Sequence, residues 1–309
     1  MSTPPSSPDS SIQTESSPSP ETPSSSPHHK MSARNRVLIF LTAWLIVLMP
    51  FLFWWNTWFG RRLPDSQITE YLHDDKHPRH IQHALIQLGE RMGRRDAAAA
   101  RWYSELTLLA SNPVEEVRNT DAWVMGQDTA IPAFHETLLK MLQDSSPMVR
   151  GNAALSLVRF GDATGRPQIV ALLEPARIVA PFAGRVTDSD KPGTAIHRGG
   201  LIAKIMVDPS LEASQNELRS IELRSPIGGR IRTLSAAPGS HVAAGAEVAT
   251  IAPADEQVWE ALRALYLIGQ PEDLPAIRPY QRELPEISDR LRQQALLAEK
   301  SIRERATHP

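Results

Sequence analysis

The sequence predicts a multidomain chain in which an α-solenoid built from helix pairs is interrupted by an all-β module and preceded by one transmembrane helix. Three observations lead to this fold class. An uncharged apolar run lies near the N-terminus, a Val-Arg pair opens two similar apolar helices, and a Gly- and Pro-rich segment repeats itself. At 309 residues, the chain is long enough for about two folded domains.

Composition excludes several classes of protein. The formal net charge is −2, so the chain lacks the basic excess typical of nucleic-acid binding, and we expect no nucleic-acid partner. It contains no cysteine, which excludes disulfides, thiolate metal sites and a cysteine nucleophile.

The first 35 residues predict a disordered tail. Residues 2–29 are mostly Ser, Pro and Thr, with Ile12 as the only large aliphatic residue. Such a segment buries too little apolar surface to offset the entropy of ordering its backbone. The sequence leaves open whether Met1 or Met31 is the start.

Residues 36–60 predict the transmembrane helix. Residues 37–60 carry no charge and, at about 24 residues, would span roughly 36 Å as a helix. Trp54, Trp55 and Trp58 lie at the end where an interfacial aromatic belt belongs, and membrane helices tolerate a proline such as Pro50. Helices of soluble proteins rarely lack a polar face over this length, which disfavours a buried core helix. A cleaved signal peptide would end in small residues, so an uncleaved anchor is favoured.

The orientation is indicated less directly, because basic residues flank the span on both sides. We expect the N-terminus in the cytoplasm and the C-terminal part outside it, since an anchor this early in a chain serves to export the domains after it. The expected localisation is a bacterial-type inner membrane, with a single pass and a periplasmic C-terminal domain.

Residues 66–175 predict helical repeats. Val117-Arg118 and Val149-Arg150 lie 32 residues apart, and each pair leads into an apolar helix followed by a second helix. Gly126 and Gly161 are placed to end the first helices in a left-handed conformation. An earlier unit, over 81–91 and 97–109, fits more loosely, as terminal repeats do.

These units resemble HEAT repeats, in which the phrase D-x-x-P-x-V-R-x-x-A-A-x-x-L opens each helix pair. The second unit carries the phrase most completely, at Asp144, Pro147, Val149, Arg150, Ala153, Ala154 and Leu157. The resemblance implies stacked helix pairs that share a continuous core.

Residues 255–307 predict a return of the helical repeat and a capping helix. Residues 258–269 form an apolar helix that ends in glycine, and 285–305 form a last helix with one apolar stripe. If the solenoid continues past the interruption, the helix at 167–173 packs against the one at 258–268, with Leu172 and Leu265 buried. The opposite face of the last helix is predicted to be solvated; its charged residues are Arg290, Arg292, Glu299, Lys300 and Arg303.

Residues 176–254 predict β structure, with short runs of Val and Ile between Gly and Pro. The segment is an internal duplication. Residues 181–186 (PFAGRV) match 226–231 (PIGGRI) at an offset of 45, and Pro192-Gly193 matches Pro238-Gly239 at an offset of 46.

This duplication resembles the biotinyl/lipoyl barrel-sandwich fold, whose halves read P-x-x-G-x-[VI]…G-x-x-[VI]-x-x-G, over about 75 residues. The resemblance implies two flattened sheets related by a pseudo-twofold axis, with the same tight glycine turns in each half. Because the ends of such a module lie close together, it can be inserted without breaking the helix stack.

Carrier members of that fold hold a modified lysine at the hairpin between the halves. Here the crossover at 206–221 has no lysine, and the lysines of the module, Lys191 and Lys204, lie elsewhere. A biotin or lipoyl carrier is therefore disfavoured, and no cofactor is expected. The module is also similar to that of periplasmic adaptor (membrane fusion) proteins, although their long helical hairpin and following β-barrel are missing here.

We predict no catalytic, cofactor-binding or metal-binding residue. Nucleotide and nucleophile-elbow motifs are absent from the sequence, and His135-Glu136 lacks the second histidine of a zincin helix. One histidine cluster could hold a divalent metal, but a solvated polar loop is the favoured interpretation; its residues are His73, Asp74, Asp75, His77, His80 and His83.

The functional hypothesis is a membrane-anchored, non-enzymatic scaffold or adaptor with protein partners, such as transporter or secretion subunits of an envelope assembly. The alternative is a general protein-interaction scaffold. Neither partners nor oligomeric state can be read from the sequence.

Overall fold

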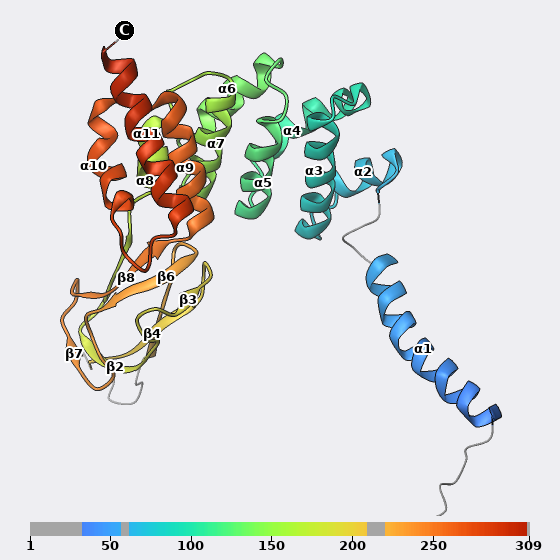
Figure 1. Ribbon diagram of the computed structural model, residues 1–309, viewed down its shortest axis with the longest axis horizontal. Helices are drawn as coiled ribbons and strands as arrows, with labels where there is room; N and C mark the ends of the chain where they lie inside the picture. The colour runs from blue at the N-terminus through green and yellow to red at the C-terminus, as the bar shows by residue number, and fades with distance from the viewer. Residues whose placement is uncertain (1–32, 57–61, 209–219, 308–309) are drawn as a thin grey trace, which may run out of the picture. The chain divides into compact units, whose positions relative to one another are not determined.

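The computed structural model describes residues 33–56, 62–208 and 220–307. It divides the chain into two compact units, Met1–Arg61 and Arg62–Pro309, which are described separately (Figure 1). The tail predicted at 1–35 lies outside the described residues, except for its last three.

The first unit contains helix α1 (Ala33–Asn56), and it corrects the predicted transmembrane segment. The described helix includes Pro50, and residues 57–60 of the predicted span lie outside the described residues. Within the described ranges, no helix combines the length and the hydropathy that crossing a bilayer requires. The predicted single membrane pass at 36–60 and the inner-membrane localisation based on it were therefore wrong.

The second unit begins with helix pairs that stack side by side. α3, α5 and α7 pack in series, α6 packs against α5 and α7, and α8 packs against α7. The helices before the strands are α2 (Asp65–Leu72), α3 (Pro78–Gly93), α4 (Tyr103–Leu109), α5 (Glu115–Met125), α6 (Pro132–Met141), α7 (Pro147–Arg159) and α8 (Arg166–Ala171), with a 3₁₀ helix at Ala97–Trp102.

The repeated phrase explains how α7 begins and what it buries. Pro147 occupies the first helical turn, where its missing N–H leaves no hydrogen bond unmade, and the Ser146 hydroxyl accepts a hydrogen bond from the Val149 N–H. The apolar positions of the phrase then enter the core at a helical period; Val149, Ala153, Ala154 and Leu157 are fully buried.

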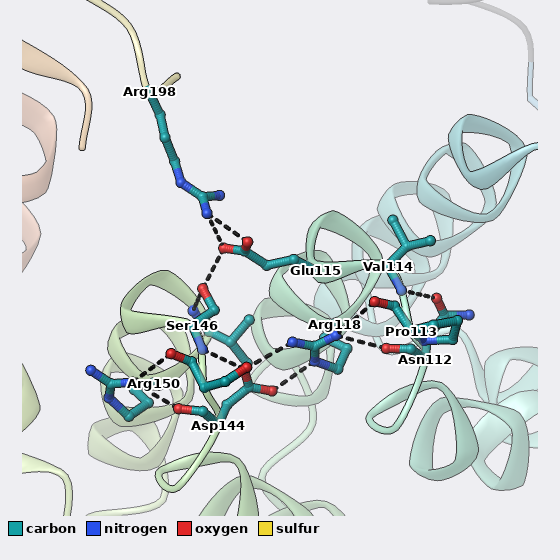
Figure 2. Close-up of polar contacts among 11 residues, drawn as sticks. Asn112, Pro113, Val114, Glu115, Arg118, Asp144, Ser146, Arg150 and Arg198 are labelled. Atoms are coloured by element: carbon teal, nitrogen blue, oxygen red, sulfur yellow. Dashed lines mark hydrogen bonds and ion pairs between the residues drawn. The ribbon is translucent and has the colours of Figure 1, made fainter. Parts of the chain in front are cut away.

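The arginine of each phrase closes its own turn (Figure 2). Arg118 donates to the Asn112 carbonyl at 2.8 Å, and Arg150 donates to the Asp144 carbonyl at 2.7 Å. Arg118 also donates to both carboxylate oxygens of Asp144, at 2.7 and 2.9 Å, and lowers the pKa of that carboxyl through this contact. The first phrase is thereby tied to the turn that opens the second.

The β module lies between α8 and α9 and consists of two four-stranded antiparallel sheets. Their orders are β1-β8-β6-β3 and β5-β4-β2-β7, so exchanging the first four strands with the last four converts one sheet into the other. The strands are β1 (Ala176–Val179), β2 (Gly184–Ser189), β3 (Ala195–Ile196), β4 (Leu201–Val207), β5 (Ser220–Arg224), β6 (Gly229–Leu234), β7 (His241–Val242) and β8 (Glu247–Pro253).

This topology corrects the barrel part of the predicted fold class. Each sheet is bounded by a two-residue strand, β3 or β7, and among the described strands no ladder joins one sheet to the other. The sheets share a separate apolar core, in which Val186 and Ile231 occupy equivalent buried positions. The module is therefore a two-sheet structure without a closed barrel.

The glycine turns of the two halves follow the duplication. Gly193 and Gly239 have φ of 88° and 89°, and Gly199 and Gly245 have φ of 76° and 79°. L-residues with a Cβ rarely adopt this conformation, so both halves need glycine at the same places, as expected.

The helices after the module continue the stack. α9 contacts both α7 and α8, and α11 packs along α9. One apolar core extends from Leu63 to Ile302 and includes residues from both sides of the module. These helices are α9 (Asp255–Ile268), α10 (Leu274–Ile277) and α11 (Asp289–Thr307), with 3₁₀ turns at Pro271–Asp273 and Arg278–Gln281.

Polar contacts reinforce this junction, which we call the seam: the contact of α7 and α8 with α9 and the 3₁₀ turns that follow it. Gln257 donates to the Leu172 carbonyl at 2.8 Å, and the Tyr280 hydroxyl donates to the Leu173 carbonyl at 2.6 Å. Arg166 donates to both oxygens of the buried Asp273 at 3.0 Å. The chain thus leaves α8 and returns as α9 at almost the same place.

Two details of the predicted packing need correction. Leu265 is fully buried as predicted, but Leu172 is half-buried against Gly151, and its neighbour Leu173 enters the core instead. Gly161 has the expected positive φ of 77°, whereas Gly126 has φ of −68°. A Cβ at Gly126 would lie 2.5 Å from the Ser156 hydroxyl, so this glycine permits close helix approach rather than a left-handed turn.

Candidate functional site

A pocket of about 720 Å³ opens on the seam, and we call it the seam pocket. Six of its lining residues precede the β module and seven follow it, so the pocket exists only because the two parts of the helix stack meet. Its residues are Trp123, Asn152, Leu155, Ser156, Val158, Arg159, Glu260, Arg263, Ala264, Tyr266, Leu267, Gln294 and Leu297.

Polar side chains of α7 build one wall of the pocket by bonding to α5. Asn152 donates to the Asn119 side-chain oxygen at 2.9 Å, Ser156 donates to the Ala122 carbonyl at 2.8 Å, and Arg159 donates to the Gly126 carbonyl at 3.2 Å. Helical spacing places these three side chains on one face of α7. They hold the two helices in fixed register beneath the pocket.

The opposite wall is fixed by the last helix. Arg305 of α11 donates to the Tyr266 carbonyl at 2.6 Å and to the Gly269 carbonyl at 2.9 Å, and Ser301 donates to the Tyr266 carbonyl at 3.0 Å. These bonds satisfy carbonyls that the end of α9 leaves without a helical partner. The backbone that presents Tyr266 and Leu267 is therefore held in place.

Large apolar side chains around the pocket are exposed. Trp123 is 40% exposed, Tyr266 42%, Leu267 58% and Leu297 51%. Trp123 also packs on α3, because a Cβ added at Gly89 would lie 2.5 Å from its ring. Contiguous exposed apolar side chains of this kind mark interaction sites on folded proteins.

The charged side chains that line the pocket include more positive than negative groups. Arg263 lies 3.4 Å from Glu260, and both are exposed, while Arg159 is also exposed and bonds only to a backbone carbonyl among the contacts described. Two guanidinium groups thus accompany one carboxylate. A ligand for this pocket would be expected to combine apolar side chains with a negative charge.

A second polar arrangement links the helices to the β module (Figure 2). Glu115, at the start of α5, forms an ion pair at 2.5 Å with Arg198 from the β3–β4 turn and accepts a hydrogen bond from Ser146. The hydrogen bond from Arg198 lowers the pKa of Glu115. Because both side chains are partly exposed, this contact orients the module more than it stabilises the fold.

The structure brings together part of the histidine cluster. Asp74, His77 and His80 gather at the turn between α2 and α3, and the pKa of Asp74 is lowered mainly by the hydrogen bond from His80. His73 instead contacts the Thr69 carbonyl at 2.8 Å, and His83 contacts the Gln87 amide at 3.0 Å. Asp75 does not belong to the group.

Other residues considered in the sequence have structural partners. Lys204 lies within β4 and forms an ion pair with Glu222 at 3.4 Å, so it does not occupy a hairpin tip. The crossover between the module halves lies mainly outside the described residues. His135 pairs with Asp162 at 2.7 Å. The charged face of α11 is paired internally, for example Arg303 with Glu299 at 2.6 Å, and Arg290 lies over the Trp259 ring.

The seam pocket could not be predicted from the sequence, because its two walls come from segments at least 101 residues apart, the separation of Arg159 and Glu260. The sequence contains one partial indication of the pocket. Leu267 and Leu297 are apolar, yet they fall outside the apolar stripes that α9 and α11 bury.

Comparison with known families gives one match. Residues 136–163, which include the whole phrase of the second unit, match the HEAT repeat family model. The resemblance to HEAT repeats is therefore confirmed for this part of the chain. HEAT repeats generally mediate protein–protein interactions. No curated protein matches the chain significantly.

Proposed function

We propose that the chain is a non-enzymatic protein-interaction scaffold whose seam pocket binds a segment of a partner protein. The observation that most supports this proposal is that exposed apolar side chains surround a pocket whose walls are held in place by hydrogen bonds. Within the pocket, Ser156 donates to a backbone carbonyl rather than to a histidine, and Arg159 bonds to a carbonyl as well. These groups are arranged for support, not as a nucleophile and its base.

The occupant that fits best is an amphipathic helix with an acidic side chain. The pocket volume of about 720 Å³ accommodates a few large side chains, and the rim is apolar on both walls. Helices commonly bind such grooves through a few apolar anchors at helical spacing. The excess of guanidinium groups favours a carboxylate on the partner near Arg159.

The finer hypothesis of an adaptor in an envelope transport assembly rests on the duplicated β module alone, because the predicted anchor was wrong. The two sheets have the same strand order once the first four strands are exchanged with the last four, and this internal symmetry supports the resemblance to biotinyl/lipoyl-like modules. The general scaffold is favoured because it needs only the helical stack and its pocket. A carrier role is disfavoured by the position of Lys204 in a strand.

Partner binding is expected to depend on the pocket. A photo-crosslinking amino acid at Leu267, introduced in the native cells, should give an adduct within one segment of a partner that carries apolar and acidic side chains. A peptide of that segment should bind the purified full chain. Trp123→Ala and Arg159→Glu should each weaken this binding about tenfold or more, because one loses an anchor and the other repels the carboxylate.

The control is Leu108 on α4, which is 75% exposed and does not line the pocket. The same photo-crosslinking amino acid at Leu108 should give no such adduct. Equal crosslinking from both positions, or unchanged peptide affinity in both folded variants, would exclude the seam pocket as the binding site.

A further inference from the structure

Three metal-ligating side chains converge in the first repeat, at a distance in sequence from the seam pocket. Asp74 lies in the turn after α2, His77 immediately precedes α3, and His80 lies in its first turn. Each offers one ligand atom, and these atoms all lie within 4.8 Å of one another.

The backbone explains the convergence. The His77 N–H donates to the Asp74 carbonyl at 3.0 Å, and the His80 N–H donates to the His77 carbonyl at 2.8 Å. Each of these bonds closes a turn that brings residue i close to residue i+3, so the two turns together hold Asp74, His77 and His80 near one another. The spacing D-x-x-H-x-x-H therefore becomes a cluster.

The side chains are also oriented toward a common point. Nδ1 of His77 lies 2.9 Å, and Nδ1 of His80 lies 2.6 Å, from the same carboxylate oxygen of Asp74. The Tyr71 ring stacks on His80, with ring centroids 4.4 Å apart and planes 10° apart, which limits rotation of that imidazole. The three candidate ligand groups are thus already close together and partly oriented before an ion binds.

We propose that Asp74, His77 and His80 form a Zn²⁺ site that clamps the turn between α2 and α3. Two imidazole nitrogens and a carboxylate oxygen are a ligand set suited to Zn²⁺, with water in the fourth position. Ligand atoms around a tetrahedral zinc ion lie about 3.3 Å apart, so the two nitrogen–oxygen distances of 2.9 and 2.6 Å to Asp74 need only a small increase. Asp74 and His80 are about one-quarter exposed, which leaves a path for the ion.

A second histidine–aspartate pair in the chain provides a comparison for the proposed Zn²⁺ site. His135 and Asp162 form a similar pair at 2.7 Å, but this pair is not part of a three-ligand group within the described residues. A single histidine–aspartate pair offers two ligands and should bind Zn²⁺ much more weakly. His135→Ala is therefore a matched control for the loss of a histidine that pairs with an aspartate.

Calorimetric titration of the full chain with ZnCl₂ tests the proposal. We expect one Zn²⁺ per chain, and Asp74→Asn and His80→Ala should each weaken its affinity by about tenfold or more. His135→Ala should leave the affinity unchanged. The d–d absorption of bound Co²⁺ should show nitrogen and oxygen ligands, and it should be lost in the same two variants.

His77→Ala provides a second variant that should still fold, because the His77 side chain is 63% exposed. Far-UV circular dichroism should confirm that each variant keeps its helices. Failure of the wild-type chain to bind one Zn²⁺ would overturn the proposal. Binding that persists at wild-type affinity in Asp74→Asn and His77→Ala would overturn it as well, because the ion would then occupy other groups.

Discussion

Replacing Asp121 by alanine is expected to stabilise the protein by about 1–3 kcal/mol below pH ~4, where the carboxyl is protonated in both the folded and unfolded chain, and by more at neutral pH. Asp121 lies on α5 and is completely buried, and neither of its carboxylate oxygens has a hydrogen-bond partner among the described residues. The equivalent position of the next repeat, 32 residues later, is Ala153, which is also completely buried. The alanine side chain thus suits this position in the stack, and the change removes an unsatisfied polar group.

The same substitution should change the pH dependence of unfolding. Burial raises the pKa of Asp121 well above its usual value of 3.8, so the folded chain keeps its proton where the unfolded chain loses it. Its contribution to stability is complete below pH ~4 and declines as the pH rises toward the folded pKa. Between the unfolded and the folded pKa of Asp121, the free energy of unfolding falls by about 1.4 kcal/mol per pH unit. Asp121→Ala should abolish this dependence.

Urea unfolding of both proteins between pH 4.5 and 7.5 measures these effects. Asp188→Ala is the control, because Asp188 is exposed on β2 and its removal should leave the slope unchanged. If Asp121→Ala destabilises the protein at pH 7, or leaves the pH dependence intact, the carboxyl has a favourable partner and the account of this position is wrong.

Replacing Leu265 by alanine is expected to lower the free energy of unfolding by about 2–5 kcal/mol. Leu265 is completely buried in the core that continues across the seam, and its helix contacts α7, α8 and α11. Because the cavity would open in a shared core, the repeats before the β module should be destabilised together with those after it.

Far-UV circular dichroism and tryptophan fluorescence during urea unfolding should report the same shifted transition. Leu267→Ala is the matched control: it lies two residues further along α9, is 58% exposed, and should change stability by no more than about 0.5 kcal/mol. A Leu265→Ala chain in which only part of the helical signal shifts would mean that the core is not shared.

The parts of the fold that could be predicted are those with a local period. The buried positions of α7 follow the repeat phrase, and the positive φ of Gly193 and Gly239 follows from the duplicated turn. Such positions are determined by neighbouring residues in the chain, so the sequence pattern contains them directly.

The parts that could not be predicted depend on contacts between distant segments. Gly126 ends α5 as predicted, but not in a left-handed conformation, and what requires glycine there is the close approach of Ser156. Asp121 occupies an alanine position of the repeat, and no pattern indicates how a buried carboxylate is tolerated there. The seam pocket requires α5 and α7 to meet α9 and α11, which only the three-dimensional stack provides.

The membrane and barrel predictions were wrong for a related reason. The membrane prediction was based on the apolar composition of 37–60, whereas no helix in the described ranges combines the length and the hydropathy that crossing a bilayer requires. The glycine pattern of the β module determines its turns and its duplication, but the closure of a barrel depends on ladders between sheets, and the turns do not determine those.

The central claim is that the helices on both sides of the β module form one stack, and replacing the module tests it most directly. Because Gln257 reaches the Leu172 carbonyl at 2.8 Å, a short Gly/Ser linker can replace 176–253 without separating α8 from α9. The lost ion pair between Glu115 and Arg198 is partly exposed and should cost no more than about 1 kcal/mol. Urea unfolding of this variant, followed by far-UV circular dichroism, should show one cooperative transition with the helices retained. Two separate transitions would contradict the claim, because the helices before and after the module would then be independent domains.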